Sequence, residues 1–101
     1  MGYFNHHAIV VIGTSTTITS AHDLAKATGA QVSELVESAI NGYQSFLVAP
    51  DGSKEGWEES AAGDERRAKI VDHLRAVHLL WSEVSFPEGE PASVVDCSED
   101  E

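Results

Sequence analysis

The first apolar stretch of the chain has the composition of a β-strand. β-Branched and apolar side chains fill the second half of residues 3–12, where Ala8-Ile9-Val10-Val11-Ile12 is apolar without interruption. Because successive side chains of a strand point to opposite faces, this run predicts a central strand that is apolar on both faces. Two sets of residues are candidates for an uncovered face: Ile9 and Val11, or Ala8, Val10 and Ile12.

Two segments have the spacing of amphipathic helices. Thr19 or Ser20 can cap a short first helix, and Gly29 suits its end. The second helix is predicted over residues 65–77, with Asp64 as its cap. The positions expected to face the core are Ala21, Leu24, Ala25 and Thr28 in the first helix, and Ala68, Ile70, Val71, Leu74 and Val77 in the second.

Residues 32–40 fit two structures. Apolar side chains follow the i, i+3, i+4, i+7, i+8 spacing of a helix at Val32, Leu35, Val36, Ala39 and Ile40. However, the segment leads directly into Asn41-Gly42 and a second apolar run over residues 43–48. Asn-Gly between two apolar runs is the strongest short signal for a β-hairpin. The pattern alone leaves helix and strand equally open here.

The remaining elements complete a fold. Residues 79–86 alternate as a strand, residues 87–91 form a turn, and residues 92–97 are expected to pair back as a short edge strand before an acidic tail. The predicted fold is α+β: a single domain over residues 1–101 with a ferredoxin-like βαββαβ two-layer sandwich, extended by that strand and tail. Two helices would cover one sheet face, and an apolar open face would favour association into a homodimer.

Composition narrows the class of protein. The chain has 101 residues, 42% of them apolar and 23% charged, which fits one globular core. Its longest apolar run, residues 8–12, is far shorter than the roughly 20 residues that span a bilayer. We expect no secretory signal, because such a signal needs a basic start and a longer apolar stretch. A single cysteine, Cys97, excludes an internal disulfide. We therefore expect a cytoplasmic protein, in a host cell if the resemblance described below holds.

Charge is large and uneven. The formal net charge is −11, and residues 76–101 contain seven acids and neither Lys nor Arg. Direct binding to nucleic acid or to an anionic membrane is disfavoured, because phosphate contacts need basic side chains. The same field would speed encounters with a basic protein.

Four segments resemble a family of small phage and prophage proteins. They are YFNHHAIVV at residues 3–11, NGYQSF at 41–46, APDGSKEGW at 49–57 and GDERR at 63–67. The resemblance covers most of the chain and implies a phage origin, although no activity is established for the family. It also implies an extended segment at residues 32–40, where its members tend to contain proline. This chain has no proline there, so a helical turn remains open.

Motifs for catalysis and metal binding are weak. His6 and His7 are adjacent on a strand and would point to opposite faces, so they would not share a metal. Cys97 lies among carboxylates, which oppose a reactive thiolate. No nucleophile elbow, zinc-protease motif or catalytic carboxylate pair is present. We therefore expect no enzyme, no metal and no cofactor.

The leading functional hypothesis is a phage accessory protein that binds a host protein. A small acidic domain could occupy the groove of a basic nucleic-acid-handling protein as a phosphate mimic, in the manner of anti-CRISPR and other anti-defence inhibitors, which is an analogy by class. The residues expected to make this contact are Glu55, Trp57, Glu58, Glu59, Glu99, Asp100 and Glu101.

The alternative is an oligomeric protein that binds a small molecule or nucleotide. The loop at residues 51–57 contains two glycines and a lysine, as phosphate-binding loops do. It does not match a P-loop, because Lys54 precedes the second glycine. The residues expected to bind an anion in this case are Lys54, Trp57, Arg66 and Arg67.

Overall fold

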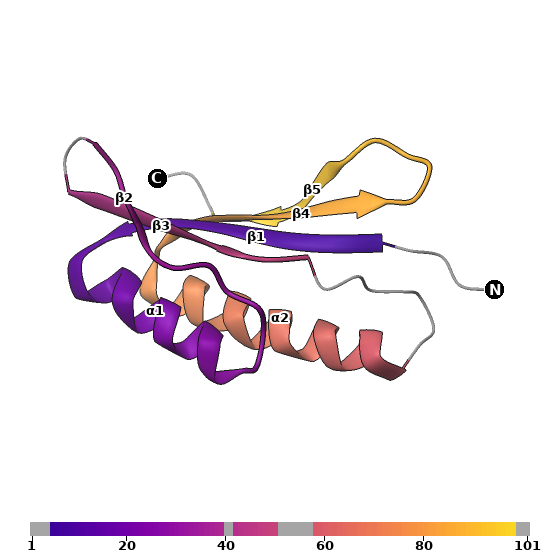
Figure 1. Ribbon diagram of the computed structural model, residues 1–101, viewed down its shortest axis with the longest axis horizontal. Helices are drawn as coiled ribbons and strands as arrows, with labels where there is room; N and C mark the ends of the chain where they lie inside the picture. The colour runs from indigo at the N-terminus through magenta and orange to yellow at the C-terminus, as the bar shows by residue number, and fades with distance from the viewer. Residues whose placement is uncertain (1–4, 40–41, 51–57, 99–101) are drawn as a thin grey trace.

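A five-stranded antiparallel sheet and two helices form the protein, which is α+β as predicted. The computed structural model describes residues 5–39, 42–50 and 58–98. Its elements are β1 (Asn5–Thr14), α1 (Ser15–Ala27), β2 (Val36–Glu37), β3 (Tyr43–Val48), α2 (Glu58–Val77), β4 (Leu80–Pro87) and β5 (Ser93–Cys97). Both helices lie on one face of the sheet, and no described helix lies on the other (Figure 1).

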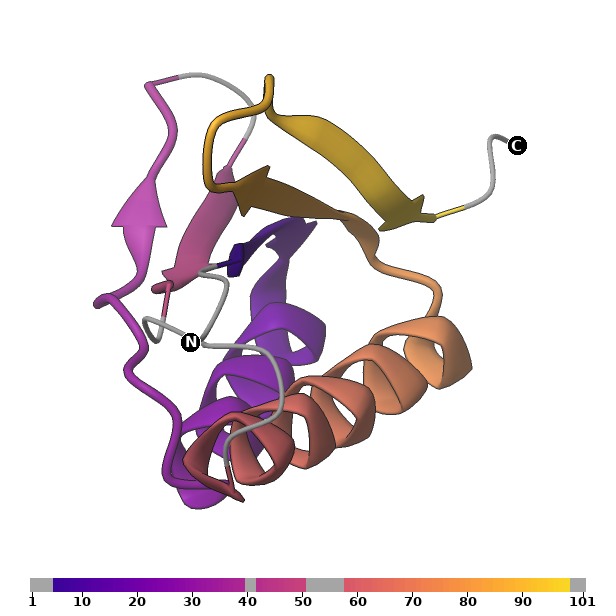
Figure 2. The same ribbon diagram turned by 90° about the vertical axis from the view of Figure 1, so that its right-hand side faces the viewer.

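β1 is the central strand of the sheet, whose order is β2-β3-β1-β4-β5. Figure 2 shows this strand between the two hairpins, with α1 and α2 side by side below it. Ile9 and Val11 point to the helices and are fully buried, whereas Val10 on the other face is 43% exposed. The second of the two predicted sets is therefore the one on the uncovered face. The small side chain of Ala8, which belongs to that set, is buried.

The hydrophobic core lies between the helices and the helix-facing side of the sheet. It is built from aliphatic side chains and two aromatic ones. The strand residues among them come together because directly opposite residues of neighbouring strands point to the same side of the sheet. Its members are Ile9, Val11, Ile18, Ala21, Ala25, Phe46, Val48, Ile70, Val71, Leu74, Leu79 and Trp81. Most of the positions predicted to face the core do so, but Ala68 is exposed.

The predicted start of α1 is wrong. The helix begins at Ser15 rather than after Thr19 or Ser20, and the residue before it, Thr14, is extended and makes no side-chain capping bond. Burial of Ile18 explains the difference, because this fully buried side chain anchors the first turn to the core. The predicted end is confirmed: Gly29 follows the helix with a φ of 91°.

The predicted start of α2 is also wrong. The helix begins at Glu58 rather than at Glu65, so Asp64 lies inside it instead of capping it. Residues 58–62 are Glu, Glu, Ser, Ala and Ala, which include strong helix formers, and their sequence has no apolar stripe to reveal the helix. The loop predicted at residues 51–57 lies outside the described residues.

Residues 32–39 form no helix, and the short strand β2 within them agrees with the extended segment that the resemblance implies. Val32 forms an isolated bridge to Val48, and Val36 pairs with Ser45. The helical spacing of the apolar residues does not correspond to a common buried face. Val32 and Leu35 pack against the core, whereas Val36 is exposed.

The junction between α2 and β4 depends on one residue in the left-handed region. His78 has a φ of 59°, and the Leu79 amide donates a hydrogen bond to the Leu74 carbonyl. This is the geometry of a Schellman motif, in which the first and last of the bonded residues also pack together. Leu74 and Leu79 are both buried in the core, so the turn places β4 in register against β1.

We predict that His78→Val destabilises the protein by about 1–2 kcal/mol, because a β-branched side chain fits the left-handed region poorly. His78→Asn is the control, since Asn tolerates this backbone conformation, and we expect it to change stability by less than about 0.5 kcal/mol. Urea denaturation followed by circular dichroism measures both. Equal losses in the two variants would show that the His78 side chain, and not its φ angle, matters.

Candidate functional site

The face of the sheet opposite the helices carries most of the exposed large apolar side chains. Val10 and Ile12 of β1 lie at its centre, with Leu47 of β3 and Leu80 of β4 directly opposite them. Opposite residues of an antiparallel pair project to the same side, so the register extends this surface over all five strands. We define the open face by its exposed apolar residues: Val10, Ile12, Val36, Tyr43, Leu47, Leu80, Phe86 and Val94.

The open face carries no Asp, Glu, Lys or Arg among the strand residues that the register places on it. The polar and small residues between its apolar ones are His6, Ala8, Thr14, Ser45, Ser82 and Cys97. By contrast, the chain as a whole has a net charge of −11. An uncharged apolar surface on so acidic a protein is typical of an interface rather than of a solvated face.

Two charged side chains of the strands, Glu83 and Asp96, point to the helix-facing side, where they have partners. His7 donates a hydrogen bond from Nδ1 to Glu83 Oε2 at 2.9 Å. The Arg67 guanidinium pairs with Asp64 and has its Nε at 3.9 Å from the same Glu83 oxygen. Arg67 is 7% exposed and Glu83 14% exposed, so these two side chains are largely buried between α2 and β4, whereas Asp64 at the edge of the cluster is 69% exposed. A pocket of about 340 Å³ adjoins it.

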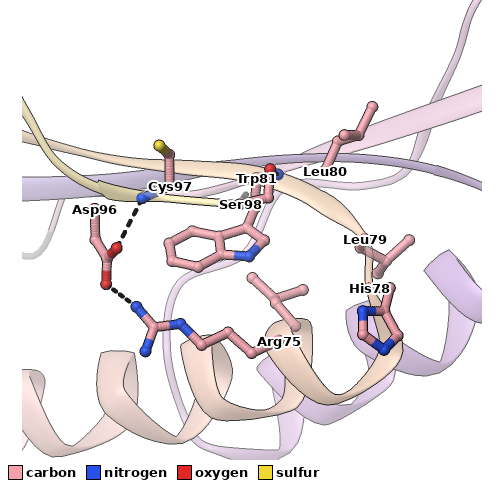
Figure 3. A pocket seen from close by; sticks show the side chains of 9 residues that line it. Arg75, His78, Leu79, Leu80, Trp81, Asp96, Cys97 and Ser98 are labelled. Atoms are coloured by element: carbon pink, nitrogen blue, oxygen red, sulfur yellow. Dashed lines mark hydrogen bonds and ion pairs between the residues drawn. The ribbon is translucent and has the colours of Figure 1, made fainter. Parts of the chain in front are cut away.

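A second pocket, of about 520 Å³, lies between the end of α2 and strands β4 and β5. Figure 3 shows the Arg75 guanidinium beside Asp96, with the Trp81 ring next to it. The Arg75 guanidinium carbon is 5.5 Å from the centre of that ring, and Arg75 forms an ion pair with Asp96. Leu80 and the Cys97 sulfur point away from this pocket, toward the open face (Figure 3). Because its cation and its carboxylate neutralise each other, the pocket is better explained as packing than as a ligand site.

Arg66 and Arg67, which the sequence suggested as anion contacts, have different surroundings. Arg67 is held by Asp64 and Glu83 as described above. Arg66 is half-buried and lines a smaller pocket of about 250 Å³ together with Gly29 and the other arginine. Only Arg66 therefore remains as a candidate anion contact of this pair.

Most of the other predicted site residues are outside the described part of the chain. Glu58 and Glu59 form the start of α2, but their side chains are not described. The predicted contacts that lie outside the described residues are Lys54, Glu55, Trp57, Glu99, Asp100 and Glu101. The acidic-contact hypothesis consequently stays a prediction.

The described acidic residues are distributed over several elements. Asp23 lies on α1, Glu37 on β2 and Asp72 on α2, while Glu88 and Glu90 lie at the turn between β4 and β5. A phosphate mimic needs carboxylates that follow a single path, as phosphates do along a strand of nucleic acid. The described carboxylates therefore give little support to mimicry of nucleic-acid phosphates. The open face gives better support to binding through apolar contacts.

The remaining histidine hypotheses concern structure rather than chemistry. His6 and His7 lie on opposite faces of β1, as predicted. His22 packs edge-on against Phe46, and its Nε2 donates a hydrogen bond to the Ser33 carbonyl at 2.7 Å. Within residues 5–39, 42–50 and 58–98, no group of three or more His, Cys, Asp or Glu side chains could hold a metal ion. No helix in the same ranges is long and apolar enough to cross a membrane.

Sequence reasoning found the centre of the open face but not its extent. The apolar run in β1 offered two alternative sets for the uncovered face, and that run alone provided no reason to place residues of the other strands on the same surface. The alternation of the strands contains this information, because residues separated by an even number of positions point to the same face. Leu80 and Phe86 share a face of β4 in this way, and Tyr43 and Leu47 share a face of β3. What pattern alone could not provide is the register that brings these residues onto one face.

Comparisons with known proteins provide no relative: no family model, no curated protein and no solved structure matches the chain. The resemblance to small phage proteins therefore stays a prediction.

We predict that Glu83→Gln destabilises the protein by about 2–3 kcal/mol, because it removes the carboxylate from a buried cluster and leaves the Arg67 cation with less compensation. Arg75→Gln is the matched control, since its ion pair with Asp96 is exposed and is worth about 1 kcal/mol or less. Urea denaturation midpoints compare the two variants. A loss at Glu83 no larger than the loss at Arg75 would contradict a buried charge cluster.

Proposed function

We propose that this chain acts by binding another protein, and that an uncharged apolar surface of that partner covers the open face. The observation that carries this proposal is the concentration of exposed Val, Ile, Leu, Tyr and Phe side chains on one sheet face that has no formal charge. A protein surface of this kind loses water favourably when it is covered, at roughly 25 cal/mol per Å² of apolar area. Its aromatic members, Tyr43 and Phe86, belong to residue types that are enriched in interfaces, and Tyr is also among those that often supply much of the binding energy.

Charge favours a protein over other occupants of this face. Bilayers of anionic lipid and nucleic acids both repel a chain with a net charge of −11. Neither would gain an electrostatic contact from a face that offers no Lys or Arg. A protein with its own apolar surface needs no such contact, so it is the occupant that the chemistry supports.

We also propose the ferredoxin-like arrangement for this sheet. Support comes from the element order β1-α1-β2-β3-α2-β4 and from the position of β1 between β3 and β4. β5 extends the sheet beyond β4. In this arrangement the helices occupy one face, which leaves the other available to a partner.

The wider biological role stays a prediction that rests on the resemblance. It comprises a phage accessory or anti-defence protein, action in the host cytoplasm, and a basic nucleic-acid-handling protein as target. The nucleotide-binding alternative also stays a prediction, with Arg66 as its described contact. Neither role depends on the open face, so both can be tested separately from the proposal made here.

We predict that a photo-crosslinking amino acid at Tyr43 or Phe86 forms covalent adducts with a protein in the cell that produces the chain. The same amino acid at Lys26 or Lys69, which are exposed on α1 and α2, should form few or none. Gel electrophoresis and mass spectrometry measure the adducts. Crosslinking in a cell extract at about 0.5 M salt should give the same adducts, because salt screens charges but does not weaken apolar contacts.

Adducts that form mainly from the helix positions would contradict the proposal, and so would open-face adducts that form at low salt but not when crosslinking is carried out at high salt. The latter result would point instead to a partner recognised by charge. Melting temperatures of the four variants serve as the folding control, since all four positions are exposed and none should change stability greatly.

A further inference from the structure

We infer that the partner on the open face is a second copy of this chain, so that two sheets pack face to face in a symmetric homodimer. This inference rests on the proposed function and identifies the partner. Three observations support it: the size of the face, the distribution of charge around it, and the condition of the sheet edges.

The open face has about the area that a dimer needs. Each strand residue covers roughly 16 Å² of a sheet, given a rise of about 3.3 Å per residue and a strand spacing of about 4.8 Å. With strands of 10, 6, 8, 5 and 2 residues, the sheet presents about 500 Å² per copy. Two copies would bury about 1,000 Å², which is at the lower limit for a specific interface and typical of a reversible dimer.

The charge distribution allows this contact for two acidic copies. Two chains with a net charge of −11 repel each other over most approaches. When the sheets meet face to face, both helical layers point outward, and with them the charged side chains of α1 and α2. Charged strand residues such as Glu83 and Asp96 also point to the helix side, where they have partners. The open face is therefore the described surface on which like charges interfere least.

The arrangement of residues on the open face suits a two-fold axis. A symmetric dimer uses the same patch on both copies, so the patch must complement itself. Val10 and Ile12 on the central strand would form the middle of the interface. Polar side chains such as Thr14 and His6, at the ends of the strand, would lie toward its rim. Two sheets packed in this way are about 10 Å apart, as in β-sandwiches.

The edges of the sheet favour this mode over pairing of edge strands. β5 has an irregularity at its pairing with Glu83 and Val84, where Val95 is left without a partner residue. Such bulges twist an edge strand and hinder the addition of another strand. The opposite edge strand, β2, has only two residues. Association through either edge would also leave the apolar open face uncovered.

Analytical ultracentrifugation of the purified full chain tests the inference. We expect a monomer–dimer equilibrium with a dissociation constant of about 1–100 µM. Raising the salt concentration from about 0.05 to about 0.5 M should lower that constant severalfold, because salt screens the repulsion between two acidic copies. A contact between this chain and a basic protein would respond in the opposite direction.

Substitutions locate the interface. Val10→Lys and Leu80→Lys should each raise the dissociation constant at least about tenfold, because a buried unpaired cation is costly. Lys is chosen because it lowers the net negative charge, so any general effect of charge would strengthen association instead. Ala76→Lys, at an exposed position on α2, makes the same change in charge and should alter the constant by less than about twofold.

A measurement on the unmodified chain keeps the test valid if a lysine variant fails to fold. Nuclear magnetic resonance signals of the Val10, Ile12 and Leu47 methyl groups should shift with protein concentration, while those of the core residues Ile18 and Ile70 should not. Concentration-dependent shifts confined to the helical layer would overturn the inference.

The outcomes separate this inference from the proposed function. If the chain is monomeric up to about 1 mM while open-face crosslinks to a different protein persist, the homodimer is wrong and protein binding through the open face stands. If the chain is monomeric and the open face forms no adducts, both are wrong. Dimers that survive Val10→Lys and Leu80→Lys would place the interface elsewhere and overturn the inference.

Discussion

β1 has apolar side chains on both faces, so covering both of its faces from water stabilises this strand most. Within the plane of the sheet, both edges of β1 are covered, because β3 and β4 flank it. The helices cover one face of the strand, where Ile9 and Val11 are fully buried. On the other face, Val10 and Ile12 remain exposed in the isolated chain. Folding of a single chain therefore covers only one of the two apolar faces of β1.

Charged strand residues occur on the helix-facing side of the sheet and not on the open face, and this difference supports a binding role for the open face. On the helix side, a buried carboxylate is tolerated because His7 and Arg67 surround Glu83. Removal of charge from the open face is not needed for folding, since an outer sheet face is normally polar in a soluble α+β protein. The apolar composition of this face thus costs solubility in the monomer, and an interface would compensate for that cost.

Several elements could be predicted from residues alone, and the errors have a common cause. The end of α1 at Gly29, which has a positive φ, depends on local backbone preference and was predicted from the residues. The pattern at residues 32–40 left helix and strand open, and the pairing of Val36 with Ser45 decided for a strand. Both predicted helix starts are wrong, because a capping residue is a weak local signal. In the structure, burial of Ile18 anchors the first helix, while α2 starts in a segment that has no apolar stripe. Tertiary contacts override weak local signals in this way.

The sequence by itself determined the α+β class, the central double-sided strand and the acidic character of the chain, because periodicity and charge are local properties. Only the tertiary structure decided which face of β1 is covered and which side chains from the other strands join the open face. That decision depends on strand register, since a shift of one residue would turn every side chain of a strand to the opposite face. The burial of Arg67 was decided in the same way, by a glutamate on β4 that lies far from it in the sequence.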